Sequence, residues 1–181
     1  MNIMIHKINL RSGLSLVEMM VVISIIAVLS GVIYASFDDA RKQARDKARM
    51  TALKELQLAV ELYKAQNGTY PSSCGGSSDF FGPGEEMGDY YADCGDEYIQ
   101  GLVPDFIDEL PQDPKSESDL GMGFYYRSDG SSYKILVQNS VEAIAVNSGD
   151  EFYRCPGSCN TQGGEDLART YAVYSSGAES W

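Results

Sequence analysis

Gly13, Leu14 and Glu18 are residues of this 181-residue chain whose types and spacing suit a chemical step. Glu18 is a carboxylate near the start of a long apolar stretch, and a charge deep in a bilayer costs about 2.5–3.5 kcal/mol on insertion scales. Gly13 is small and follows a segment that contains Lys7 and Arg11. A peptidase that cut after Gly13 would expose the α-amine of Leu14, which is largely protonated at neutral pH.

The spacing of four residues places the Leu14 amine and the Glu18 carboxylate on one face of a helix. The two charges can pair within one chain, or between neighbouring chains that are shifted by about one helical turn. An unpaired Glu18 in a low-dielectric helix bundle is strongly penalised, so pairing across chains would set the register of packing.

Two other interpretations of the first 40 residues explain less. A cleaved secretory signal has a shorter apolar run, and here the helical pattern continues without a cleavage site. A plain signal anchor explains the length of the run but leaves Glu18 without a partner.

One long helix is predicted from about Leu14 to Gln66. Residues 14–37 are apolar and contain no proline, and a helix of that length covers about 36 Å, enough to cross a bilayer. Residues 38–66 continue without a breaker and become amphipathic. Asn67-Gly68 is a stop signal for the helix.

The amphipathic half carries one apolar stripe that should pack against a core. Its members recur at helical spacing: Leu53, Leu56, Val60 and Tyr63. Two pairs of opposite charge, Asp38 with Lys42 and Asp46 with Arg49, also have a spacing that stabilises a helix.

Residues 67–181 are predicted to form a domain with a small antiparallel β-sheet. "GFYYRSDGSSYKILVQ" predicts a β-hairpin, because β-forming residues flank a Ser-Asp-Gly-Ser turn. "VEAIAV" (141–146) is the predicted third strand, and "RTYAVYSS" (169–176) is a candidate fourth. Residues 72–96 are rich in Gly, Pro and Ser and are expected to form a long loop. The predicted fold class is therefore α+β.

The four cysteines, Cys74, Cys94, Cys155 and Cys159, all lie in this domain. An even number indicates disulfides and an oxidising compartment. The sequence does not determine their connectivity; the expected pairs are Cys74–Cys94 and Cys155–Cys159, because Pro156-Gly157 can turn the short loop back on itself. The cysteine spacings disfavour a zinc site.

The chain is acidic, with a formal net charge of −12. An acidic surface repels phosphate backbones, so no direct nucleic-acid binding is expected. The acidic run from Asp79 to Asp96 offers oxygen ligands for Ca²⁺, but it lacks EF-hand spacing, and a solvated acidic loop is the preferred interpretation. The only histidine, His6, precedes Gly13. With no imidazole in a mature chain and no nucleophile–base pattern, neither an enzyme nor a cofactor site is predicted.

The stretch "RSGLSLVEMMVVISIIAVLSGVI" resembles the class III signal of type IV prepilins and type II secretion pseudopilins. That pattern combines a basic leader, a glycine at the cut, a hydrophobic first mature residue and a glutamate four residues later. "LYKAQNGTYP" and "FIDELPQDP" are similar to segments of the same superfamily, particularly its major pseudopilin branch. The resemblance is strong over residues 7–71 and weaker up to Val137.

The resemblance implies a pilin-like fold, with a long N-terminal helix packed on a small antiparallel sheet. It also implies that residues 1–13 are a leader removed by prepilin peptidase, and that Leu14 becomes the N-methylated terminus, where family members most often have Phe. Glu18 would contact the Leu14 amine of a neighbouring subunit. An inner-membrane platform protein and a cytoplasmic assembly ATPase would be further partners.

The predicted function is a structural subunit, a major or major-like pilin, of a type IV pilus-like helical filament. Before assembly it would cross the cytoplasmic membrane once with its C-terminal domain outside; afterwards it would belong to an extracellular filament. A close alternative is a pseudopilin of a type II secretion system. An alternative of another class is a membrane-anchored exterior binding domain that never polymerises.

The basic residues give the opposite orientation. Two precede the apolar stretch, whereas five follow it: Arg41, Lys42, Arg45, Lys47 and Arg49. Counted alone, they place the C-terminal domain in the cytoplasm. The cysteines and the resemblance favour an exterior domain, and the basic segment is then expected to lie beside Asp38, Asp39 and Asp46 of neighbouring subunits.

Overall fold

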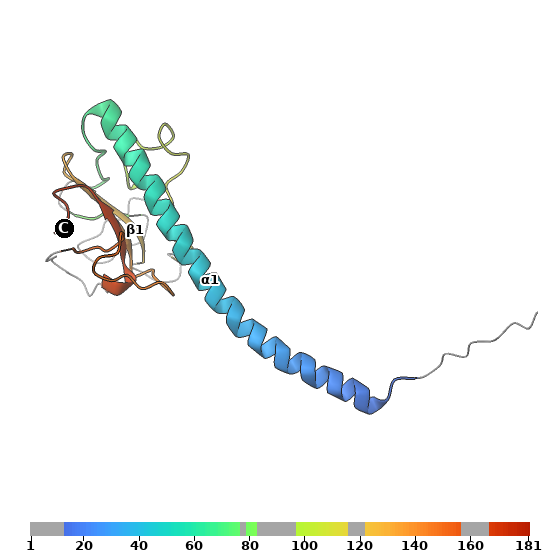
Figure 1. The fold of residues 1–181 in the computed structure, drawn as a ribbon. Helices are drawn as coiled ribbons and strands as arrows, with labels where there is room; N and C mark the ends of the chain where they lie inside the picture. Colours follow the sequence, from blue (N-terminus) through green and yellow to red (C-terminus); the bar gives the residue numbers. More distant parts are fainter. Residues whose placement is uncertain (1–12, 77–78, 83–96, 116–121, 157–166) are drawn as a thin grey trace, which may run out of the picture. The chain divides into compact units, whose positions relative to one another are not determined.

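The long helix α1 runs from Leu16 to Asn67 in the computed structural model of the chain (Figure 1). The structure describes residues 13–76, 79–82, 97–115, 122–156 and 167–181, without the side chains of residues 32–36. The chain divides into two compact units, Met1–Ala40 and Arg41–Trp181.

The predicted helix stop is confirmed. Gly68 adopts a φ of 81°, and its N–H donates to the carbonyl of Lys64 at 2.8 Å. The side-chain amide of Asn67 donates to the carbonyl of Tyr63 at 2.9 Å. A left-handed residue after the last turn satisfies carbonyls that would otherwise lack partners, and glycine adopts that conformation without strain.

The sheet has three antiparallel strands in the order β1-β2-β3: β1 (Gly123–Ser128), β2 (Tyr133–Gln138) and β3 (Tyr171–Tyr174). The predicted hairpin is therefore confirmed. Its turn is held by Asp129, whose carboxylate accepts the N–H groups of Ser131 and Ser132 at 2.8 and 2.7 Å. Asp129 thus supplies the turn with acceptors that the backbone alone would lack.

The prediction of a strand at 141–146 is wrong, since the structure assigns no strand there. The N–H groups of Glu142, Ala143 and Ile144 donate to the carboxylate of Asp46 on α1, at distances from 2.7 to 3.1 Å. A backbone that uses these donors on a side chain cannot offer them to a neighbouring strand. The third strand is β3, within the segment predicted as the candidate fourth.

The core lies between the second half of α1 and one face of the sheet (Figure 1). Leu53, Leu56 and Val60 of the predicted stripe are fully buried, and Tyr63 is half-buried with its ring centroid 5.3 Å from that of Phe106. They pack against alternate residues of the strands: Phe124, Tyr126, Tyr133, Ile135, Val137, Tyr171 and Val173. The expected α+β, pilin-like arrangement of a long helix on a small antiparallel sheet is confirmed.

The opposite face of the sheet carries a second, smaller cluster: Phe80, Tyr125, Leu136 and Ala172. Phe81 extends the sheet beyond β1, because it exchanges both backbone hydrogen bonds with Tyr126 at 2.9 and 2.7 Å. The sheet is therefore covered on both faces, which explains why every residue of β2 is buried.

Candidate functional site

The predicted processing residues lie at the start of α1. Gly13 and Leu14 precede the helix, and Leu14 is 72% exposed. The carboxylate of Glu18 accepts the backbone N–H of Ser15 at 2.7 Å, while the hydroxyl of Ser15 accepts the N–H of Val17 at 3.4 Å. Ser15 and Glu18 therefore form a capping box, in which each satisfies a donor at the helix N-terminus.

Glu18 thus caps the N-terminus of α1, a role that was not predicted from the sequence. The Ser-x-x-Glu spacing is the sequence signal that could have predicted this role. The N–H that Glu18 accepts belongs to Ser15, which follows Leu14 directly. An α-amine formed at Leu14 would thus be one peptide unit from a group that Glu18 already binds. A carboxylate in the first turn also complements the positive end of the helix dipole.

The first half of α1 exposes large apolar side chains on all sides. Their exposed fractions lie between 46% and 74%: Leu16, Val17, Met19, Met20, Val21, Val22, Ile23, Ile25, Ile26, Val28 and Leu29. A helix that is apolar all round needs lipid or other helices to cover it. Among the residues that the structure describes, no helix is long and apolar enough to cross a membrane.

Arg49 is the centre of a buried ion-pair cluster in the unit Arg41–Trp181. It is 2% exposed, and its Nε and Nη2 donate to both carboxylate oxygens of Asp113 at 2.6 and 2.9 Å. Its Nη1 donates to Asp46 and to Glu142, each at 2.9 Å. Two-pronged contacts of this kind are among the strongest hydrogen bonds in proteins. Because Asp46 and Asp113 are also buried, each charge depends on the others for its solvation.

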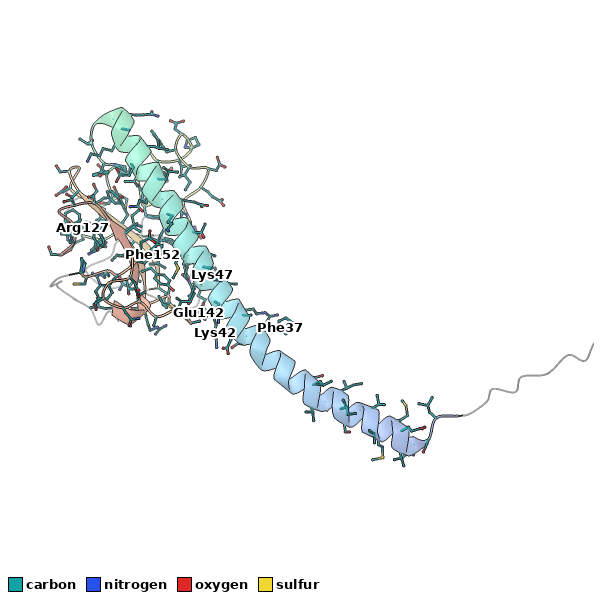
Figure 2. The ribbon with its side chains drawn as sticks, in the orientation of Figure 1. Phe37, Lys42, Lys47, Arg127, Glu142 and Phe152 are labelled. Atoms are coloured by element: carbon teal, nitrogen blue, oxygen red, sulfur yellow. The ribbon has the colours of Figure 1, made fainter. Side chains whose placement is uncertain are left out.

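Two further cationic side chains contact Glu142 at the edge of this cluster. Arg45 donates to both of its carboxylate oxygens at 2.7 and 2.6 Å, and Lys115 lies 2.8 Å from one of them. Figure 2 shows Glu142 beside α1. The hydrogen bond from Arg45 is the largest cause that holds the pKa of Glu142 well below its usual range, with further contributions from Lys115 and Arg49. Glu142 therefore stays ionised over the physiological pH range.

Asp46 faces the interior of its own chain. Its carboxylate is fully buried and accepts three backbone N–H groups in addition to the guanidinium of Arg49. The expectation that Asp46 lies beside the basic segment of a neighbouring subunit is therefore wrong. Its predicted partner at helical spacing, Arg49, is confirmed at 2.9 Å.

Lys134 is a second buried charge, on the opposite face of the sheet. Its Nζ donates to the backbone carbonyl oxygens of Glu179 and Trp181 at 3.0 and 2.8 Å. Burial, followed by the nearby guanidinium of Arg154, lowers its pKa to about 7. The guanidinium carbon of Arg127 lies over the Trp181 ring, 4.5 Å from its centroid, and Figure 2 labels this arginine. Together these contacts hold residues 179–181 against the sheet.

Comparison with known families bears on the N-terminal residues. Residues 8–34 match the family model described as the prokaryotic N-terminal methylation motif. The chain carries the class III prepilin signal of the type IV pilin and pseudopilin superfamily. The matched range contains Gly13, Leu14 and Glu18, and it includes the exposed apolar residues of α1 up to Leu29. No curated protein and no solved structure matches this pilin-like chain.

Two of the four cysteines, Cys74 and Cys155, lie in the described part of this pilin-like protein. Cys74 and Cys155 are each disulfide-bonded. Cys94 and Cys159 lie outside the described residues, so the pairs Cys74–Cys94 and Cys155–Cys159 stay a prediction. Most of the acidic run from Asp79 to Asp96, for which a solvated loop is preferred over a Ca²⁺ site, also lies outside them. Within the described part of the chain, no group of three His, Cys, Asp or Glu side chains is arranged to hold a metal.

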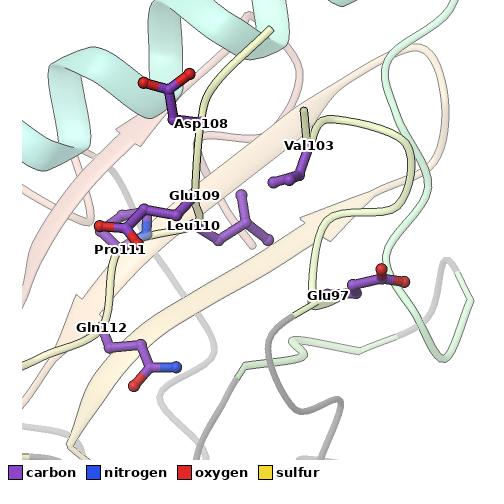
Figure 3. A pocket seen from close by; sticks show the side chains of 7 residues that line it. All are labelled: Glu97, Val103, Asp108, Glu109, Leu110, Pro111 and Gln112. Atoms are coloured by element: carbon purple, nitrogen blue, oxygen red, sulfur yellow. The ribbon is translucent and has the colours of Figure 1, made fainter. Parts of the chain in front are cut away.

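Two open grooves lie along residues 103–112. One, of about 570 Å³, is lined by Glu97, Val103 and residues 108–112 (Figure 3). The other, of about 380 Å³, lies between residues 55–62 of α1 and residues 104–108. Their lining residues combine apolar side chains with carboxylates and include no histidine, cysteine, serine or lysine. Such a lining offers no nucleophile, and it suits an apolar or cationic partner better than a substrate for catalysis.

Proposed function

We propose that this pilin-like protein is a structural subunit, major or major-like, of a type IV pilus-like helical filament. Prepilin peptidase would remove residues 1–13 after Gly13, and Leu14 would become the N-methylated terminus. The observation that carries the proposal is the match of residues 8–34 to the methylation motif, on a helix that exposes apolar side chains on every side.

The proposed cycle begins in the cytoplasmic membrane, which residues 14–37 would cross with the C-terminal domain outside. The platform protein and assembly ATPase would then extract the subunit into the filament, where helix–helix packing replaces lipid contacts. Residues 38–66 would link the filament core to the exterior domain, residues 67–181. Glu18 would pair with the Leu14 amine of a neighbour, because a carboxylate in a dry helix bundle requires a partner.

The processing step is tested by intact-mass and N-terminal analysis of the protein from its native membrane. The mature chain is expected to begin at Leu14 and to carry one added methyl group. A mature chain that begins at Met1 would contradict the proposal.

The assembly step is tested with Glu18→Ala. The variant is expected to be cleaved but not assembled into sheared filaments, because the charge that docks the neighbouring terminus is missing. Ser15→Ala is the matched control, since it removes the capping hydroxyl but keeps the carboxylate, and it should assemble. Normal filaments from Glu18→Ala would remove the central step of the proposal.

A pseudopilin role in type II secretion is the second candidate, because "LYKAQNGTYP" and "FIDELPQDP" resemble the major pseudopilin branch. Deletion of the gene separates the two roles. Loss of surface filaments in electron micrographs supports the pilin, whereas retention of an exported protein inside the cell supports the pseudopilin. A membrane-anchored binding domain that never polymerises would show neither effect.

The proposed orientation has its own test at Cys74, which is half-buried. After reduction, an impermeant thiol reagent added to intact spheroplasts should label Cys74. Labelling only after the membrane is opened would place the domain in the cytoplasm.

A further inference from the structure

We propose that the groove between α1 and residues 104–108, called here the acidic groove, is an interface between subunits. Its occupant would be the basic segment of α1, Arg41–Lys47, from a second copy of this chain. The inference rests on the proposed function, because it assigns one contact within the filament.

The floor of the acidic groove is apolar and uncovered. Leu58 is 62% exposed and Leu62 is 46% exposed, although α1 buries its opposite face in the core at these same turns. Pro104, Phe106 and Ile107 line the other side of the groove. Large apolar side chains gathered in this way on a folded domain typically mark a protein–protein contact.

The rim of the acidic groove is negatively charged. Glu55, Asp105 and Asp108 line it and are exposed. None of the three has a hydrogen-bond or ion-pair partner among the described residues, whereas Glu61 on the same helix binds the hydroxyls of Tyr70 and Tyr133. Unpaired carboxylates around an apolar floor favour a partner that carries cations.

The basic segment of α1 supplies matching cations. Arg45 and Arg49 are held by carboxylates of their own chain, but Arg41 and Lys47 are exposed, and no side chain in the described part of the chain pairs with them. Figure 2 marks Lys47 on the helix. Ala44 and Ala48 are also exposed on this segment, so the helix backbone can approach a neighbour closely.

One chain cannot bring its own two patches together. Along α1, Arg41 lies 14 residues, or roughly 20 Å, from Glu55, and Lys47 lies eight residues, or roughly 12 Å, from it. The cations must therefore reach the acidic groove of another copy. A contact between two different patches is heterologous, and when its rotation does not close a ring it generates an open helical filament.

Charge reversal with rescue tests this assignment in the full chain. Arg41→Glu/Lys47→Glu and Asp105→Lys/Asp108→Lys are each expected to lower the yield of sheared filaments on the order of tenfold or more, because like charges would then face each other. The four substitutions combined are expected to restore most of the yield. Yields are divided by the amount of mature protein in the membrane, which corrects for variants that fold poorly.

The matched control is Glu97→Lys/Glu109→Lys, which makes the same charge change in the neighbouring groove (Figure 3). This control is expected to assemble like the wild type. Wild-type assembly by either reversed pair alone, or a combined variant no better than the single pairs, would overturn the inference.

A second measurement does not depend on variants. Filaments assembled from a mixture of normal and heavy-nitrogen subunits are treated with a carbodiimide, which joins amines to carboxylates in contact. Lys47 is expected to link to Glu55, Asp105 or Asp108 in peptides that mix the two isotopes. Links from Lys47 only to other carboxylates would overturn the inference while leaving the filament intact. A wild-type chain that forms no filament would instead overturn the proposed function.

Discussion

Arg49 shows how one side chain can tie distant parts of this chain together. Asp113 and Glu142, which it binds, lie 64 and 93 residues away in the sequence. Neither Arg49 nor Asp113 can exchange its partner for water, because both are buried. The cluster therefore specifies one arrangement of α1 relative to two loops, and the loss of a single member leaves buried charge without its partner.

Arg49→Ala is predicted to lower the free energy of unfolding by about 3–5 kcal/mol, because it leaves Asp46 and Asp113 as buried charges without their cation. Urea unfolding of the purified protein measures the change. The control is Arg41→Ala, an exposed substitution on the same helix, which should change stability by no more than about 0.5 kcal/mol. Equal losses in the two variants would mean that water reaches the cluster.

Lys134 makes stability depend on pH. Its folded pKa of about 7 lies below the ordinary lysine value of 10.5, so between these values the unfolded chain holds a proton that the folded chain has released. Stability is therefore predicted to rise as the pH increases from about 7 to 9. Burial raises the pKa of Tyr125 to about 12, and this opposes the trend only above about pH 10.

The measurement is urea unfolding at several pH values. Lys134→Met is expected to flatten the rise between about pH 7 and 9, whereas Lys47→Met, which removes an exposed lysine, should leave it in place. A rise that persists in Lys134→Met would assign the proton to another group.

At the scale of elements, periodic patterns predicted most of the structure. The stripe of Leu53, Leu56 and Val60 and the hairpin of β1 and β2 follow from local spacing, and a local property is visible in sequence. The segment 141–146 has β-forming residues, yet a carboxylate almost 100 residues away takes its backbone donors. No window of sequence contains both partners, so this contact could not be predicted.

Asp46→Asn is predicted to loosen the 141–146 segment without unfolding the sheet. Hydrogen bonds to a charged acceptor contribute about 1.5–3 kcal/mol, so the amides of Glu142, Ala143 and Ile144 should exchange with solvent at least about tenfold faster. Hydrogen exchange measured by NMR tests this. The amides of Ile135 and Val137 in β2 are the internal control, and their acceleration to the same degree would indicate global destabilisation instead.

At the scale of the molecule, the positions of the basic residues have a structural explanation. Of the five that follow the apolar stretch, Arg45 and Arg49 bind Glu142 and Asp113, so the fold requires them whichever side of the membrane the domain occupies. Arg41 and Lys47 remain for contacts with other copies. The number of basic residues after the apolar stretch is therefore weaker evidence for a cytoplasmic domain than it is when they are counted from the sequence alone.

The unit Arg41–Trp181 is predicted to fold without the residues before it. Both described core clusters and the Arg49 cluster lie within it. A chain that starts at Arg41 should unfold cooperatively in urea. A chain that starts at Thr51 is the comparison; it lacks Arg45, Asp46 and Arg49 and should be markedly less stable. Equal stability of the two chains would show that the cluster is dispensable.

The start of α1 also determines which peptide bond is accessible to a protease. Proteases need unwound backbone, which is found in exposed segments and chain termini, and the bond between Gly13 and Leu14 lies just outside the helix. The capping box of Ser15 and Glu18 holds that boundary in place. Without Glu18 the first turn would fray further along the chain, which leaves the bond just as open to the enzyme. The proposed cleavage after Gly13 should therefore survive the loss of this carboxylate, whereas the proposed pairing with a neighbouring Leu14 amine should not, so the two proposed steps would depend on different members of the six residues 13–18.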